Sequence, residues 1–259
     1  MIQDRRAEID FRRPFRPWMR FDARTGLILL VLFSAIRFGL VMQANVTKSY
    51  ALVPWLFVAM ALTPMILLTR AGRRRIGLAP PRPIGLVVGL GAGIGCCLVM
   101  AVSAALLFGG GDDNAFVYLA VTYAGLPARM DDQTRLVLFA VFALIGMSFS
   151  PIGEELFYRG LVHESFVPRL GERGAAMVDA GAFALVHLAH FGLVWRMSGW
   201  AFLPGPALWW IVGLFGTALM FTWARRRAGS VFGAVAAHAG FNLTMTAWIF
   251  YGVLPGAPL

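Results

Sequence analysis

Long apolar runs, separated by short polar and basic segments, recur along the whole chain. Seven of them approach or exceed the roughly 20 residues that a helix needs to cross a bilayer. A further apolar stretch, 115–125, is too short to span and is expected to lie in the interface or to re-enter. The pattern predicts an all-α, polytopic transmembrane helix bundle of about seven spans, as one domain over 26–255. The predicted helices are 26–43, 51–69, 84–108, 135–155, 174–194, 207–224 and 231–253.

The basic residues fall mainly between these runs. The chain is 59% hydrophobic and carries a net charge of +10, with Lys48 as the single lysine among 23 basic residues. With a cytoplasmic N-terminus, eighteen of them lie in cytoplasmic segments, including 156–173, and four on the opposite side. The positive-inside rule therefore predicts that the N-terminus is cytoplasmic. It also explains the positive charge without a nucleic-acid partner.

The segment 1–25 combines seven arginines with interleaved aromatic residues. A basic, aromatic segment next to a membrane span is typical of binding to anionic lipid headgroups. We therefore expect a juxtamembrane tail with membrane lipid as its partner. The arginine-rich and nearly lysine-free composition suggests the bacterial inner (cell) membrane.

Two adjacent glutamates and an arginine interrupt the apolar background within Pro151–Gly160. Ionisable groups in a membrane protein are expensive and usually mark a functional site. On a helix, Glu155 and Arg159 share one face at i and i+4, whereas Glu154 points about 100° away. We expect Arg159 to hold Glu155 ionised, and Glu154 to project freely into a cavity as a general base.

Other polar side chains follow in later apolar runs. His187 lies four residues after Phe183, and His238 and Asn242 form an i, i+4 pair whose side chains can converge on one ligand atom. Each feature alone has a structural explanation, such as an interhelical hydrogen bond. Their joint occurrence favours a catalytic site, because unpaired polar groups are costly in an apolar environment.

Other hydrolytic sites match the sequence less well. Gly109-Gly-Gly-Asp112 fits the Gly-x-Gly-Asp pattern of intramembrane aspartyl proteases, with Asp179 as its only intramembrane partner, but it falls in a loop. Neither a Gly-x-Ser-x-Gly elbow nor a His-Glu-x-x-His motif occurs. His187 and His190, with a glutamate, are residue types that bind zinc, so the metal requirement stays open.

The polar residues resemble the CPBP family, the membrane proteases that include the CAAX prenyl endopeptidases and the bacterial Abi proteins. That family's pattern is Glu-Glu-x-x-x-Arg, then Phe-x-x-x-His, then His-x-x-x-Asn/Asp. The chain matches it in order with Glu154–Arg159, Phe183–His187 and His238–Asn242. The motif core covers roughly 150–245, and the N-terminal half is similar only as a hydrophobic helical region.

The resemblance implies an intramembrane endopeptidase acting on a peptide or membrane-protein substrate. It also leaves open whether the reaction uses zinc or a metal-free, glutamate-activated water. The roles that it implies are general base for Glu154 with help from His187, oxyanion stabilisation for His238 and Asn242, and orientation of the site for Glu155 and Arg159.

Two non-proteolytic functions fit part of the pattern. One is a non-catalytic membrane scaffold or bacteriocin-immunity-type protein of the same fold, and the other is a transporter or channel. The complete set of motif residues favours a protease over a scaffold. No internal repeat is evident and the charged residues form one cluster, which disfavours transport.

The predicted boundaries set one geometric condition. They place Glu154 at the cytoplasmic end of its helix, whereas His187 lies some 13 residues into its own helix, a depth difference of about 20 Å. The site can close only if the helix that carries Glu154 continues past residue 155 or tilts strongly.

Overall fold

The computed structural model describes residues 11–123, 125–127, 129–197 and 199–255. The longer helices are α1 (Ala23–Thr47), α2 (Val53–Leu67), α4 (Pro83–Phe108), α6 (Asp132–Glu155), α7 (His163–Val186), α8 (Pro204–Ala228) and α9 (Val231–Trp248). The shorter elements are α3 (Arg70–Arg75), α5 (Ala115–Leu119), the 3-10 turns η1 (Ala120–Tyr123) and η3 (His187–Ala189), the π-helical segments η2 (Leu156–Val162) and η4 (Ile249–Val253), and the strands β1 (Leu193–Arg196) and β2 (Gly199–Phe202).

The predicted all-α class is confirmed, and each of the seven predicted helices exists. Four helical stretches of the described chain are long and apolar enough to cross a membrane: Ala23–Thr47, Pro83–Phe108, Asp132–Ala189 and Pro204–Ala228. The chain is therefore an integral membrane protein by length and composition of its helices. The count of seven spans and the cytoplasmic N-terminus stay predictions.

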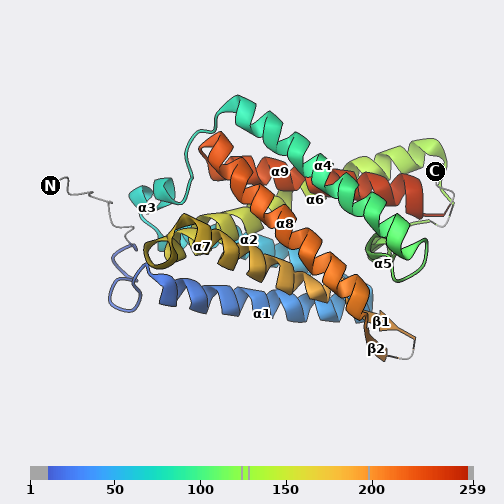
Figure 1. The fold of residues 1–259 in the computed structure, drawn as a ribbon, viewed down its shortest axis with the longest axis horizontal. Helices are drawn as coiled ribbons and strands as arrows, with labels where there is room; N and C mark the ends of the chain where they lie inside the picture. Colours follow the sequence, from blue (N-terminus) through green and yellow to red (C-terminus); the bar gives the residue numbers. More distant parts are fainter. Residues whose placement is uncertain (1–10, 124, 128, 198, 256–259) are drawn as a thin grey trace.

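The long helices run between two ends of the molecule (Figure 1). The basic helix α3 lies at one end, and α5 and the β1–β2 hairpin lie at the other (Figure 1). Large apolar side chains point outward, among them Val31 on α1, Val99 and Leu106 on α4. An apolar exterior of this kind is suited to lipid, and the charged side chains are correspondingly gathered inside.

Polar residues cap several helix starts where the sequence changes from loop to apolar run. The carboxylates of Asp22 and Asp131 accept the backbone N–H groups of Thr25 and Thr134. Such caps satisfy N–H groups that have no partner within the helix. At the exposed start of α6, the backbone hydrogen bond from Thr134 lowers the pKa of Asp131.

Helices α4 and α9 pack closely through small residues. Gly89 and Gly93 lie four residues apart on α4, and a side chain at Gly93 would overlap the backbone carbonyl of Ala237 on α9. Gly85, four residues earlier, faces Ala228 at the end of α8. Small residues at this spacing let two helix backbones approach within a membrane. The glycine row thus brings α9, which carries His238, against the body of the bundle.

The predicted end of the helix at residue 155 is wrong, whereas the side of the membrane on which 156–173 lies stays a prediction. Helix α6 continues without a break through the buried segment η2 into α7, and the chain reverses only at Gly171, where φ is 67°. Across this reversal, His163 Nδ1 lies 2.6 Å from Asp179 Oδ2, although a straight helix would separate residues 16 positions apart by about 24 Å. The helix that carries Glu154 therefore continues past residue 155, as closure of the site requires.

The predicted helix 174–194 is too long at its C-terminal end. After Val186 the chain makes the 3-10 turn η3 and then the β1–β2 hairpin, which the sequence did not predict. Gly192, between η3 and β1, has a φ of 106°, a positive value that glycine adopts without strain as the chain turns into the hairpin. The apolar stretch 115–125 forms only the short elements α5 and η1.

Part of the predicted basic tail can be followed. Residues 1–10 of it lie outside the described residues. Phe11 pairs with Leu68, and the Arg12 backbone N–H donates to the Leu67 carbonyl at 2.8 Å. This part of the tail is therefore anchored to the C-terminal end of α2.

Candidate active site

The two glutamates at the end of α6 are both fully buried. Glu154 forms an ion pair with Arg37 of α1, in which Arg37 Nη2 lies 2.6 Å from Glu154 Oε1. The Ser150 hydroxyl donates to Glu154 Oε2 at 3.3 Å. The expectation that Glu154 projects freely into a cavity is wrong, because α1 supplies a cation that the local sequence did not reveal.

Glu155 has the partner that its spacing predicts. Arg159 Nη1 donates to Glu155 Oε1 at 3.1 Å, and Arg159 Nε lies 3.8 Å from Asp179 Oδ1. The guanidinium also stacks over Phe183, with Arg159 Cζ 4.3 Å from the ring centroid. Arg159 is thus fixed by two carboxylates and an aromatic face, and it holds Glu155 in turn.

His238 of α9 lies between the two glutamates. Its Nδ1 is 2.8 Å from Glu155 Oε1 and its Nε2 is 3.8 Å from Glu154 Oε2. Because an ionised carboxylate only accepts, Nδ1 is the donor to Glu155. The ring therefore presents Nε2 towards Glu154.

His187 contacts Glu154 only through Arg37. Its Nδ1 donates to the Phe183 carbonyl at 2.6 Å, and its Nε2 accepts from Arg37 Nη2 at 2.9 Å. The Trp210 indole donates to the His187 carbonyl at 3.1 Å. The two bonds of the ring nitrogens, to Phe183 and Arg37, correspond to the tautomer that carries its proton on Nδ1.

Asn242 does not share an acceptor with His238. Its amide Nδ2 donates to the Gly146 carbonyl on α6 at 2.8 Å. Both side chains line the same cavity, and their convergence on one ligand atom stays a prediction.

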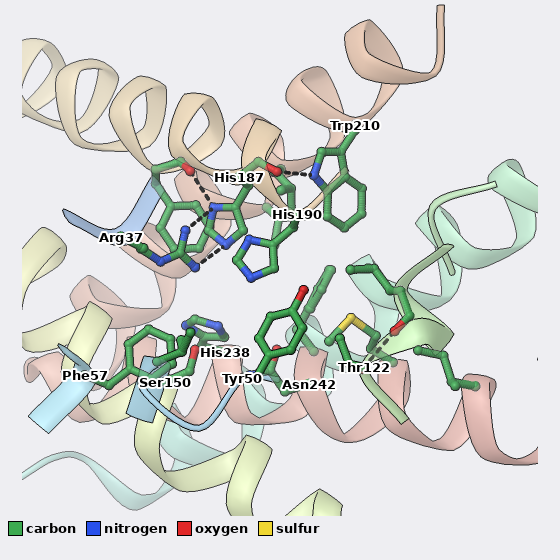
Figure 2. Close-up of a pocket in the computed structure, with 18 of the residues that line it drawn as sticks. Arg37, Tyr50, Phe57, Thr122, Ser150, His187, His190, Trp210, His238 and Asn242 are labelled. Atoms are coloured by element: carbon green, nitrogen blue, oxygen red, sulfur yellow. Dashed lines mark hydrogen bonds between the residues drawn. The ribbon is translucent and has the colours of Figure 1, made fainter. Parts of the chain in front are cut away.

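The cavity encloses about 250 Å³ next to these groups. Figure 2 shows Arg37, His187, His190 and Trp210 along one side of it, and Ser150, His238, Tyr50 and Asn242 along the other. Glu154 is adjacent to the wall, because three of its neighbours, Arg37, Ser150 and His238, line the cavity. The apolar part of the wall includes Phe57, Phe183, Leu214, Phe221, Phe241 and Ile249.

The site does not fit a metal ion as it is arranged. Nowhere in the described parts of the chain are three or more His, Cys, Asp or Glu side chains grouped so that they could hold one. The donors that the sequence offers are already engaged, since the same Arg37 nitrogen contacts both Glu154 and His187. His190 also lines the cavity, and its Nδ1 has no hydrogen-bond partner among the described residues.

Residues 136–244 match the family model described as Type II CAAX prenyl endopeptidase Rce1-like. This segment is similar to that family. The resemblance drawn from the three motifs is confirmed, and the Rce1-like segment, less than half of the chain, contains all six candidate site residues. Comparison with curated proteins and with solved structures gave no match. The matched family is one of proteases, and the segment lies in a chain whose helices include some long and apolar enough to cross a membrane.

Sequence reasoning missed the contribution of Arg37. Arg37 lies inside the first predicted span, 26–43, and an arginine within a span is itself a signal of function. Tyr50 and Phe57 also reach the cavity from before the Rce1-like segment. Nothing in their local sequence distinguishes them from residues that pack against lipid or other helices.

Proposed function

We propose that the protein is an intramembrane endopeptidase that hydrolyses peptide bonds of a membrane-associated substrate with a water activated by Glu154. The observation that carries the proposal is the position of Glu154: a carboxylate paired with Arg37 at 2.6 Å, with its second oxygen facing His238, beside a largely apolar cavity. A fixed cation offsets the cost of burying such a carboxylate.

In the proposed reaction, Glu154 takes a proton from water as the water oxygen forms a bond to the peptide carbonyl carbon. The carbonyl oxygen becomes an oxyanion. Glu154 then returns the proton to the amide nitrogen, the C–N bond breaks, and a carboxyl group and an amine are released. General acid–base catalysis of this kind contributes about 10² to 10⁴ in rate.

The remaining motif residues support these steps. We assign the stabilisation of the oxyanion to the Asn242 amide and to His238 Nε2 when both ring nitrogens of His238 carry a proton, each oxyanion donor contributing on the order of 3 kcal/mol. Asn242 donates to Gly146 in the structure, so its amide has to be shared with or moved to the substrate. Glu155 and Arg159 orient His238 through the Glu155 carboxylate. His187 acts on Glu154 through Arg37.

The proposal includes the seven-span topology with a cytoplasmic N-terminus and a place in a bacterial inner membrane. The substrate is a peptide or membrane protein that enters the cavity from the bilayer. The family description names prenylated CAAX substrates. The large apolar share of the cavity wall is compatible with a lipid-modified or an apolar peptide segment.

The test compares cells that express wild-type chain, Glu154→Gln or the control Glu164→Gln at equal levels. Glu164 is a glutamate on α7 that pairs with Arg225 away from the cavity. Peptide termini in the membrane fraction are mapped by mass spectrometry, and a farnesylated peptide and its unmodified form are assayed with the purified proteins. We expect new peptide termini in cells that express wild type or Glu164→Gln. In cells that express Glu154→Gln, the abundance of these termini should fall by about 10²-fold or more.

Identical termini in all three strains, with no peptide cleaved, would exclude the protease and favour the scaffold or immunity-type function. Cleavage of the farnesylated peptide alone assigns a prenylated substrate. Cleavage that persists in Glu154→Gln assigns the base to another residue.

A further inference from the structure

The guanidinium of Arg37 occupies the point where the donors of the site converge. One nitrogen, Nη2, lies 2.6 Å from Glu154 Oε1 and 2.9 Å from His187 Nε2. Arg37 is 2% exposed, and its Nε has no hydrogen-bond partner. The contacts of this side chain with polar groups are therefore concentrated at its tip, on the two residues that the motifs identify.

The groups around Arg37 are those that bind a divalent cation in other proteins. A carboxylate oxygen and an imidazole nitrogen with a free lone pair are common zinc ligands. His187 donates through Nδ1 to a backbone carbonyl, which leaves Nε2 as the lone-pair atom, the arrangement found in metal-binding histidines. His238 Nε2, 3.8 Å from the other oxygen of Glu154, is a third group of the same type.

We propose that Arg37 is the resident cation of this site: it orients Glu154 and His187 and keeps a divalent metal ion from binding between them. An arginine provides a permanent charge and a planar set of donors, so it fixes both partners in direction as well as in charge. The positioning half of this inference rests on the proposed function, and the exclusion of metal does not.

A purely structural role is the alternative, and Arg135 shows what such a role looks like. Arg135 is also buried, at 3% exposure, but it donates to the backbone carbonyls of Phe250 and Pro255. Arg135 is not among the residues that line the cavity next to the motif residues. Arg135 is therefore the matched control, a buried arginine of equal exposure whose partners are neither carboxylate nor imidazole.

The first experiment measures zinc binding rather than activity. Purified full-length wild type, Arg37→Ala and Arg135→Ala are dialysed in detergent against buffered Zn²⁺, and bound metal is measured by mass spectrometry. We expect Arg37→Ala to bind about one zinc ion per chain with at least about tenfold higher affinity than the other two proteins. The double variant Arg37→Ala/Glu154→Gln should lose this gain, because it lacks the carboxylate.

Two results would overturn the exclusion of metal. One is zinc bound at about one ion per chain by the wild type, a measurement that needs no variant to fold. The other is a folded Arg37→Ala that binds no more zinc than Arg135→Ala. If Arg37→Ala does not fold, Arg37→Gln and Arg37→Lys are compared, because Gln removes the cation and Lys keeps it, and equal zinc binding by these two overturns the inference.

The second experiment tests positioning with the cleavage assay. A positioning cation predicts that Arg37→Gln lowers kcat by about tenfold or more with little change in KM, that Arg37→Lys recovers part of kcat, and that Arg135→Gln keeps wild-type kcat. Equal kcat for Arg37→Gln and Arg135→Gln would overturn positioning. Failure of the proposed function is distinguishable, because it would leave Glu154→Gln as active as wild type while the zinc result stands.

Discussion

At the scale of single residues, the buried charges form two groups that meet at His238. Glu154 is paired with Arg37, and Glu155 is paired with Arg159, which also contacts Asp179. A charge without a partner is strongly unfavourable in a low-dielectric interior, so each carboxylate here has its own arginine. Adjacent residues in the sequence thus have separate environments, which suits one of them to proton transfer and the other to orientation.

The Arg159 network gives a prediction about stability. Replacing Arg159 by Gln leaves Glu155 and Asp179 as buried carboxylates without a cation, and removal of one partner of a buried pair typically destabilises by about 3 to 5 kcal/mol. The matched variant is Arg196→Gln, whose bridge to Asp113 at 2.8 Å is exposed and contributes less than about 1 kcal/mol. Thermal unfolding in detergent measures both, and equal shifts in Tm would contradict the prediction.

The sequence predicts those site contacts that are local in the chain. The Glu155–Arg159 pair follows from helical spacing alone. The contact between Arg37 and His187 joins residues 150 positions apart, so it depends on how α1 packs against α7. Without that packing, Glu154 is expected to be free, which is the error that the structure corrects.

At the scale of elements, the uninterrupted course of α6, η2 and α7 determines the depth of the site. Hydropathy predicts a solvent-exposed segment after Glu155, because it scores Arg159, His163 and Glu164 as though they faced water. In the fold these side chains pair internally with Glu155, Asp179 and Arg225. Hydropathy depends on the local sequence and does not include such pairing. The predicted end of the helix therefore came too early.

The packing of α4 on α9 gives a prediction about a single glycine. Gly93→Val places a branched side chain against the Ala237 backbone, whereas Gly91 on the same helix has open space around its Cα. Backbone cannot move aside as a side chain can, so we expect Gly93→Val to destabilise by about 2 kcal/mol or more and Gly91→Val by much less. Tm values in detergent for the two variants test this, and similar values would show that the two helices do not pack as described.

At the scale of the whole molecule, the site is assembled from both sides of the family boundary. The segment 136–244 carries the motif residues, but Arg37, Tyr50 and Phe57 come from α1, α2 and the loop between them. A search for motifs in the matched segment alone would therefore describe Glu154 without its cation. This is also why the N-terminal half could be predicted as helices and not as part of a site.

The arrangement of the ends predicts how the protein lies in its membrane. The basic helix α3 lies at the end opposite to the β1–β2 hairpin (Figure 1), and the positive-inside rule assigns the α3 end to the cytoplasm. Single cysteines are introduced at Ala71 and at Met197, both exposed, in a chain without Cys96 and Cys97. A membrane-impermeant maleimide should label the cysteine at 197 in intact cells and the one at 71 only after permeabilisation. The reverse pattern would invert the topology. Labelling of both cysteines in intact cells would place α3 and the hairpin on the same side of the membrane. The helices between them could then not cross the bilayer an odd number of times.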